Sequence, residues 1–303
     1  MSRSYSLNYA VGVFLEETDG IHQSKRAAKR LSRDGVSDKI HSYGTRARYC
    51  GIVKDFVEKM RSQGVRRVNQ LKGEHLAKYL HDKAGWTTEK TMKVNMSALT
   101  KFFKMKAIGR RDLVETIEAN RGSVLRRAKP SGHAVPFSNP EKVIGRLKRP
   151  ESKAIATIML NSSARIDDVP KVVHSVMDNE RTPGANLTIL IKKSKGGRDR
   201  ELDFDDRVEK YELIREAARI LNDALGKRNW VAIKAEAYRD LRVACDSLKE
   251  TYTGFHAFRA NYAQRRHKEL MEEKGVPERE ALQKTTKDLG HNRVAMALTY
   301  IRR

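Results

Sequence analysis

Apolar residues repeat at helical spacing through the first part of the chain. Between residues 49 and 60 they recur at intervals of three and four, the period of one helix face, and Gly64 follows as a stop signal. A shorter helix with an inward face at residues 76–80 is predicted next, and Thr87 or Thr88 can cap a third. The buried stripe expected for that third helix is Met92, Met96, Leu99, Phe102 and Phe103. The pattern predicts a small helical bundle.

Two stretches break this pattern. Residues 1–38 combine a short apolar patch with a basic helical run that stops at Gly35, and we interpret them as a basic N-terminal arm. The run is either a solvated helix or an arm that contacts a nucleic-acid backbone or another protomer. Residues 106–137 are rich in Gly, Pro, Ser and cations, which indicates a linker, and Pro130 and Pro136 cannot lie inside a helix. With a boundary near residue 130, the expected organisation is an arm at 1–38, a helical domain at 39–128, a linker at 129–137 and a second domain at 138–303.

The second domain is predicted to mix helices with one hairpin. One helix is expected before Pro150 and one after it, and two more are expected around Trp230. Between these pairs, apolar residues alternate over 187–191 and again over 202–204, with a Gly-Gly break between the two runs. This alternation is typical of a β-hairpin, and its tip would carry Lys195. The expected fold class is mainly α with a small β-sheet: a helical N-terminal domain followed by an α+β domain.

Charge indicates what such a protein binds. The 303 residues include 62 Lys and Arg against 38 Asp and Glu, a formal net charge of +24 at pH 7. Most soluble domains lie within about eight charges of neutrality. Because the basic residues are spread over the whole chain, a long polyanionic partner is favoured over a merely well-solvated surface.

The remaining composition narrows the cellular setting. Cys50 and Cys245 lie far apart and make no metal-ligand spacing, so reduced, structural thiols are expected. The N-terminus lacks the uninterrupted apolar segment of a signal peptide, and no window approaches the roughly 18 apolar residues of a membrane-spanning helix. We expect a soluble, cytoplasmic protein.

Six residues of the second domain form a candidate catalytic set: Arg165, Lys195, His256, Arg259, His291 and Tyr300. His256 and Arg259 are three residues apart, so they share one face of a helix. Guanidinium groups donate in pairs to phosphate oxygens and do not lose their protons. The transition state of phosphoryl transfer spreads negative charge over the equatorial oxygens, which a cluster of cations can stabilise in place of a metal. No paired-carboxylate or His and Cys pattern for a metal is present, so neither metal nor cofactor is expected.

These residue types also supply a nucleophile. A tyrosine phenol, with a free pKa of about 10, becomes competent beside cations and a proton acceptor. His256 or His291 can hold or accept the proton of Tyr300, and Lys195 is the candidate general acid for a leaving 5′-oxygen. Each residue alone also has a purely structural interpretation, such as a core histidine for His256.

The order of the motifs resembles the tyrosine recombinases, the phage-integrase and Xer-like family. His-x-x-Arg occurs at 256–259 and Leu-Gly-His at 289–291, nine residues before Tyr300. Arg165 and the hairpin motif Lys-Gly-Gly-x-x-Arg, at 195–200, precede them. In the first domain, the segment TMKVNMSALTKFF is similar to a helix that recurs in the core-binding domain of the family.

The resemblance implies a SAM-like core-binding domain followed by a catalytic domain, with the six residues above in catalytic roles and Asp168 supporting the first arginine. The implied activity is site-specific DNA recombination or integration of a mobile element, through a 3′-phosphotyrosine intermediate and a Holliday junction. The implied partners are two DNA duplexes, a homo-tetramer and accessory DNA-bending proteins, in the nucleoid of a prokaryote or with a virus. Expected DNA contacts are the basic residues between the inward positions of the first domain and at its end: Arg46, Arg48, Lys90, Lys93, Lys101, Lys104, Arg126 and Arg127.

The match has departures. The family usually has Thr three residues before the nucleophile and His two after it, whereas here Thr299 directly precedes Tyr300 and Arg302 follows two later. Many relatives continue past the nucleophile into a helix that docks on a neighbouring protomer, and we expect residues 1–38 to take that role here. Two alternative functions stay open: a type IB topoisomerase-like or hairpin-resolving enzyme, and a catalytically idle DNA-binding accessory protein of the same fold.

Overall fold

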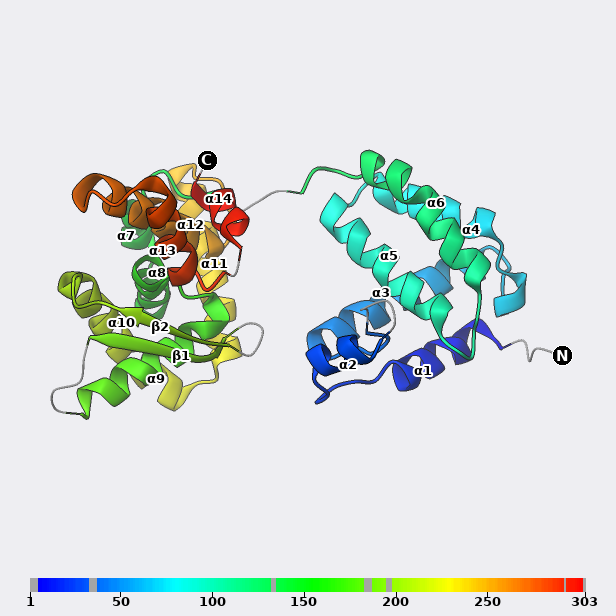
Figure 1. Cartoon of the computed structure of the whole chain (residues 1–303), viewed down its shortest axis with the longest axis horizontal. Coiled ribbons are helices and arrows are strands. Elements are labelled where there is room, and N and C mark those ends of the chain that lie inside the picture. The colour runs from blue at the N-terminus through cyan, green and yellow to red at the C-terminus, as the bar shows by residue number, and fades with distance from the viewer. Residues whose placement is uncertain are drawn as a thin grey trace. The chain divides into compact units, whose positions relative to one another are not determined.

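The chain divides into two compact units, which are described separately. Figure 1 shows the computed structural model, which describes residues 5–32, 37–131, 135–182, 187–194, 198–291 and 293–301. Unit 1 is Met1–Gly132 and unit 2 is His133–Arg303. The division falls close to the boundary near residue 130 that the sequence predicts.

Unit 1 is a helical bundle. It contains α1 (Leu7–Glu17), α2 (Lys25–Leu31), α3 (Tyr43–Ser62), a 3-10 turn (Val68–Gln70), α4 (Gly73–Ala84), α5 (Glu89–Lys104) and α6 (Arg111–Arg127). Thr88 caps α5 by accepting the backbone N–H of Thr91 at 3.3 Å. The predicted apolar stripe of α5 is fully buried and packs with the inward residues of α3, α4 and α6. The bundle predicted from helical spacing is therefore confirmed.

Helices α1 and α6 show where the sequence interpretation was wrong. In α1, Leu7, Ala10 and Phe14 recur at helical spacing and lie in the core of unit 1, so this part of the predicted arm belongs to the bundle. Helix α6 fills much of the region 106–137 that was expected to be a linker. Its inward residues, Leu113, Ile117 and Val124, are buried, but they are few, and the polar residues between them and the cations at both ends of the helix concealed the repeat. In α2, by contrast, no residue is buried.

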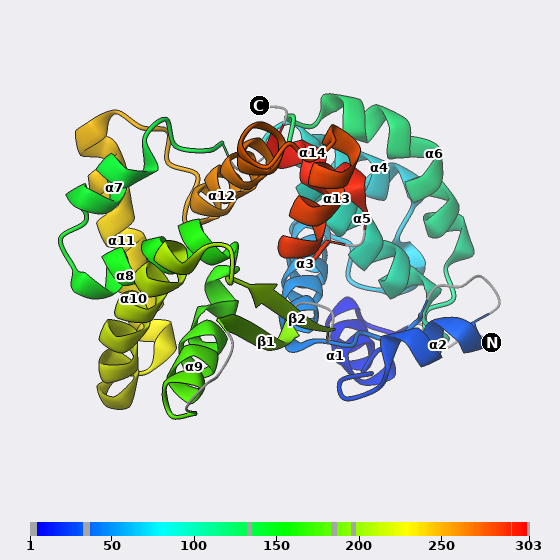
Figure 2. The same cartoon turned by 60° about the vertical axis from the view of Figure 1, so that its left-hand side comes forward.

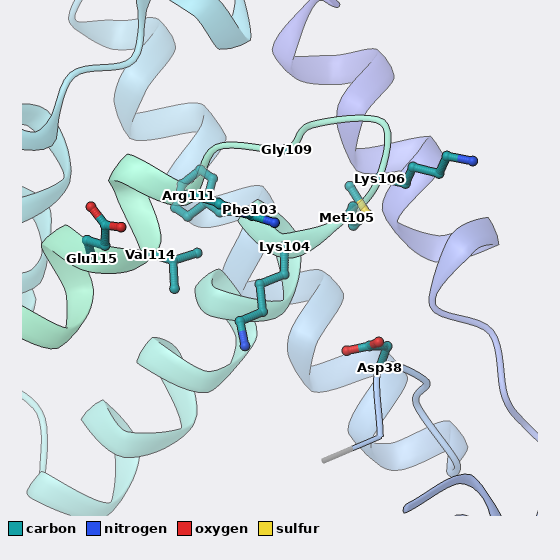
Figure 3. Close-up of a pocket in the computed structure, with 9 residues that line it drawn as sticks. All are labelled: Asp38, Phe103, Lys104, Met105, Lys106, Gly109, Arg111, Val114 and Glu115. Carbon is teal, nitrogen blue, oxygen red and sulfur yellow. The ribbon is translucent and has the colours of Figure 1, made fainter. Parts of the chain in front are cut away.

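A hollow of about 630 Å³ lies in unit 1 where α5 ends and α6 begins (Figure 3). Three cations line it, Lys104, Lys106 and Arg111, against the two acids Asp38 and Glu115, so the hollow carries charges of both signs. The hollow belongs to unit 1, whereas the candidate catalytic residues all belong to unit 2.

Unit 2 is built around α8. Its elements are α7 (Pro140–Arg146), α8 (Pro150–Ser162), a 3-10 turn (Ile166–Asp168), α9 (Val169–Glu180), β1 (Thr188–Ser194), β2 (Arg198–Asp203), α10 (Val208–Lys227), α11 (Trp230–Leu248), α12 (His256–Lys268), a π turn (Glu269–Glu273), α13 (Glu278–Asp288) and α14 (Val294–Ile301). Helix α8 is buried along most of its length and packs against α10, α11 and α12. Pro150 is the first residue of α8, a position at which the missing N–H of a proline costs no helical hydrogen bond. Trp230 is the first residue of α11.

Strands β1 and β2 form the predicted antiparallel hairpin. Ile189 pairs with Leu202 and Ile191 with Arg200, and the register shifts between Ile191 and Ser194. Directly opposed residues of an antiparallel pair point to the same face. Because Ile189, Ile191 and Leu202 are buried, this register places the side chain of Arg200 on the core face of the hairpin.

The predicted fold class, mainly α with a small sheet, is confirmed. Helices α12, α13 and α14 pack on one another, as Figure 2 shows, and bring the end of the chain onto the element that begins with His256. Within the described residues, no helix combines the length and the apolar character needed to cross a membrane.

Candidate active site

Tyr300 lies between the two candidate histidines. Its hydroxyl is 2.8 Å from Nε2 of His256, at hydrogen-bonding distance. The ring of His291 stacks on the Tyr300 ring, with centroids 5.7 Å apart and planes 22° apart. Helix α14 carries Tyr300 and packs on α12, where the side-chain amide of Gln264 donates to the Tyr300 carbonyl at 3.2 Å. Residues 44 positions apart in the chain thus meet through the packing of α12, α13 and α14.

Arg259 is the fully buried cation of this site. It is 0% exposed and lies one turn after His256 on α12. Its guanidinium donates to the backbone carbonyls of Ser163 and Leu289, and Nη2 lies 3.3 Å from Nε2 of His291. The two carbonyls come from the end of α8 and the end of α13, so Arg259 ties three helices together.

The contact with Arg259 fixes the protonation of His291. An arginine can only donate, so Nε2 of His291 must accept and the proton lies on Nδ1. Burial and the neighbouring charges of Arg259 and Arg165 lower the pKa of His291 to about 4, which keeps it neutral at pH 7. Within the described part of the chain, the buried Nδ1 has no hydrogen-bond partner. His291 therefore offers one unused donor.

Arg165 is held by a buried carboxylate. Asp168 is 4% exposed and accepts a hydrogen bond from the Ser194 hydroxyl at 2.8 Å. Lys171 and Arg165 approach the same carboxylate at 3.2 and 3.7 Å, and Arg165 also donates to Ser194 at 3.2 Å. The short turn Ile166–Asp168 returns the chain on itself, which brings the carboxylate of Asp168, the residue before α9, back to Arg165. Asp168 thus links the hairpin, α9 and Arg165.

Arg200 is a buried cation of the same cluster, and the sequence analysis names it only as the last residue of the hairpin motif, not as a site residue. Its side chain is 6% exposed, and burial together with the charge of Arg165 lowers its pKa to about 10. Burial together with the charges of Arg200 and Arg165 also lowers the pKa of Arg259, to about 9. Arg200 lies two residues before Leu202 on the alternating face of β2, and that phase is the signal that would have found it.

The structure brings Arg165, His256, Arg259, His291 and Tyr300 into one cluster, with Asp168 beneath Arg165. Lys195 lies outside the described residues. The arrangement presents cations and unused donors around a tyrosine hydroxyl that lies within hydrogen-bonding distance of a histidine ring nitrogen, so it suits attack on a phosphate diester.

The basic residues expected to contact DNA lie in unit 1 in two kinds of surroundings. Three have partners within the chain: Arg46 pairs with Asp19, Lys93 with Glu89, and Lys101 donates to the carbonyl of Ser37. The side chains of the others are exposed: Arg48, Lys90, Lys104, Arg126 and Arg127. These residues remain predicted DNA contacts.

Comparison with protein-family models matches residues 34–107 to "Phage integrase, N-terminal SAM-like domain". That range covers α3, α4 and α5 of unit 1. No curated protein sequence matches the chain.

Solved structures extend the likeness to both units. The chain is 14% identical to lambda integrase in a dimer bound to a COC′ core site, with a TM-score of 0.59 over 99% of this chain and 78% of that one. It is 12% identical to the Tn1549 transposon integrase in complex with circular intermediate DNA, with a TM-score of 0.61 over 98% and 95%. It is 15% identical to the XerH site-specific recombinase on a difH substrate, with a TM-score of 0.55 over 97% and 91%.

These matches confirm the resemblance to the tyrosine recombinases that the sequence motifs indicate. The solved structures that share this fold are two integrases and a site-specific recombinase. Residues 34–107 match the model of the phage-integrase SAM-like domain, and the chain as a whole has the tyrosine-recombinase fold.

Proposed function

We propose that this protein is a site-specific DNA recombinase or integrase that cuts and rejoins DNA through Tyr300. The observation that carries the proposal is the 2.8 Å contact between the Tyr300 hydroxyl and His256, inside a cluster that also holds Arg165 and Arg259. A phenol in hydrogen-bond contact with a base and surrounded by guanidinium groups is arranged for attack on phosphorus.

The residues divide the chemistry among themselves. Tyr300 Oη attacks the phosphorus of the scissile phosphate while its proton passes to Nε2 of His256. Of the two histidines that the sequence left open for this role, His256 is favoured, because the Nε2 atom of His291 is occupied by Arg259 and its pKa is about 4. Arg165, Arg259 and the free Nδ1–H of His291 stabilise the charge on the non-bridging oxygens.

The leaving 5′-oxygen takes a proton, for which Lys195 is the proposed general acid. The products are a 3′-phosphotyrosine and a free 5′-hydroxyl, so the energy of the broken phosphodiester is kept in the new one. Attack by a 5′-hydroxyl of a partner duplex reverses the step and passes through a Holliday junction. The exchange requires four protomers on two duplexes. Lambda integrase has been seen as a tetramer bound to such a junction, and it has the same fold.

The test is trapping of the covalent intermediate. Full-length protein is incubated without metal with nicked suicide duplexes that carry candidate sites from beside its gene, and the products are resolved on a denaturing gel. Wild type should give a protein–DNA band that Tyr300→Phe lacks. The matched control is Tyr252→Phe, because Tyr252 packs against Arg242 and is not one of the candidate catalytic residues, so its loss should leave the band.

Each other outcome identifies a different function. DNA binding with no adduct on any substrate would reject the proposal in favour of an accessory DNA-binding protein. An adduct accompanied by relaxation of supercoiled DNA but no strand exchange would reject recombination in favour of a type IB topoisomerase-like enzyme.

A further inference from the structure

Arg200 is buried without a partner that matches its charge. Its Nη1 atom lies 3.5 Å from the carbonyl of Ser163, a contact at the limit of hydrogen bonding, and Nε and Nη2 have no partner among the described residues. Within that same part of the chain, no carboxylate lies within 4.0 Å of the guanidinium; Asp168 and Asp288 act on it only from farther away. A buried charge in this condition is costly unless a counterion is supplied.

A second buried arginine of unit 2, Arg207, has hydrogen-bond and ion-pair partners for its guanidinium group. Arg207, 7% exposed, donates to the Tyr262 hydroxyl at 3.1 Å and to the Asp203 carbonyl, forms an ion pair with Asp206, and stacks on Phe204. The two arginines are seven positions apart and equally buried, so burial alone does not explain why one of them lacks partners.

The surroundings of Arg200 are also shaped to admit it. Gly290, of the Leu-Gly-His motif, has φ of +61°, and a Cβ at that position would lie 2.9 Å from Cδ of Arg200. Any other residue would therefore both adopt a strained backbone and displace the arginine. The motif glycine that precedes His291 is thus the residue that lets a third guanidinium enter the cluster.

We infer that Arg200 is a positioning residue of the anion site: together with Arg259 it holds the Ser163 carbonyl, and its charge is balanced by the phosphate that the site binds. The identity of the anion as a DNA phosphate rests on the proposed function, whereas the existence of the anion site does not. Arg200 acts through Arg165 and Arg259 and through the field it adds to the site; the attack itself remains with Tyr300.

The test separates an anion-site role from a packing role, with sulfate as the probe. The thermal midpoint of the full chain is measured at increasing sulfate concentration, with chloride at matched ionic strength as the reference. In Arg200→Met, which keeps the aliphatic stem, the sulfate-specific stabilisation should disappear, corresponding to a sulfate dissociation constant raised about ten- to a hundredfold. Without sulfate, its midpoint should be no lower than that of wild type, because an uncompensated buried charge has been removed.

Arg207→Met is the matched control. It should lower the midpoint, because it removes the guanidinium that donates to the Tyr262 hydroxyl and the Asp203 carbonyl and that pairs with Asp206, but it should keep the sulfate response. Arg200→Lys restores the charge without the planar fork and should recover part of the response. If Arg200→Met does not fold, the sulfate response of Arg200→Lys still tests whether Arg200 belongs to the anion site.

Two results would overturn the inference: a sulfate response in Arg200→Met equal to that of wild type, or a response lost equally in Arg207→Met. Adduct formation is followed separately, and Arg200→Met should slow it at least tenfold at saturating DNA. If wild type forms no adduct while sulfate still stabilises it through Arg200, the anion site stands and the recombinase proposal fails.

Discussion

Replacement of Asp168 by asparagine tests how the candidate site is held together. The substitution keeps the shape of the side chain and removes its charge. Asp168 is 4% exposed and receives the Ser194 hydroxyl at 2.8 Å, the Lys171 ammonium at 3.2 Å and Arg165 at 3.7 Å. Asparagine can still accept from Ser194, but its amide group then faces a cation that has lost its counter-charge.

The size of the effect follows from these contacts. A hydrogen bond to a charged group contributes about 1.5 to 3 kcal/mol, and removal of one partner of a buried pair costs about 3 to 5 kcal/mol. Because Lys171 and Arg165 are partly exposed and the Ser194 contact survives, we expect unfolding free energy to fall by about 2 to 3 kcal/mol. For a unit of this size that corresponds to a midpoint lower by about 4 to 12 °C.

The measurement uses the distribution of the two tryptophans, Trp86 in unit 1 and Trp230 in unit 2. In a Trp86→Phe background, the fluorescence of Trp230 during urea unfolding of the full chain reports on unit 2. The matched control is Asp178→Asn, which removes an exposed acid of α9 whose partner, His174, is also exposed, and should change nothing measurable. A loss below about 0.5 kcal/mol in Asp168→Asn, the usual range for surface substitutions, would refute the view that this carboxylate anchors Arg165.

Two further predictions concern pH and helix stability. Burial and neighbouring cations lower the pKa of His291 to about 4, whereas the unfolded chain protonates it near pH 6.5. The unfolded state therefore binds the extra proton between these values, so the contribution is fully present above about pH 6.5 and is lost as pH falls toward 4. The urea midpoint of unit 2 in the wild type should fall as the pH is lowered through this window. The fall should be less steep in His291→Gln and as steep as in the wild type in the control His174→Gln. Equal slopes in the wild type and both variants would contradict the prediction. In unit 1, Gly51→Ala should raise unfolding free energy by about 0.5 to 1 kcal/mol, because an added Cβ on this exposed position of α3 meets nothing within 4 Å. Gly64→Ala, at φ of +84°, should instead destabilise, and Trp86 fluorescence reports both.

The sequence was informative where one periodicity dominated a segment. The stripe of α5 and the alternation of Ile189, Ile191 and Leu202 predicted a helix and a hairpin, because each apolar residue faces a single core. In α6 only Leu113, Ile117 and Val124 mark the inward face, and the Gly, Ser and cations around them gave the signature of a linker. A helix with so few apolar residues on its inward face has the sequence pattern of a loop, and only the neighbouring helices that bury this face show that it is a helix.

The residue types of the site were predictable from the sequence, but the groups that orient them were not. Motif spacing selected His256, Arg259, His291 and Tyr300, since a helix face and a short connection relate them locally. Lys195 stays a prediction, since its placement is not described. Arg200 entered the sequence analysis only as the last residue of the hairpin motif, and the register with Ile191 shows that its side chain points inward.

The groups that orient Arg259 are main-chain carbonyls, and this explains why no motif could reveal them. Ser163 ends α8 in the left-handed region, with φ of 55°, and this bend directs its carbonyl to Arg259 while its hydroxyl donates to the carbonyl of Asp288 at 2.6 Å. Leu289 ends α13 and offers the other carbonyl. The last carbonyls of a helix lack partners within the helix and carry its partial negative charge, so two helix ends converging on one guanidinium can stabilise it without any acidic side chain. A carboxylate in that place would neutralise the charge that a phosphate needs, whereas backbone carbonyls fix the arginine and leave most of its charge available.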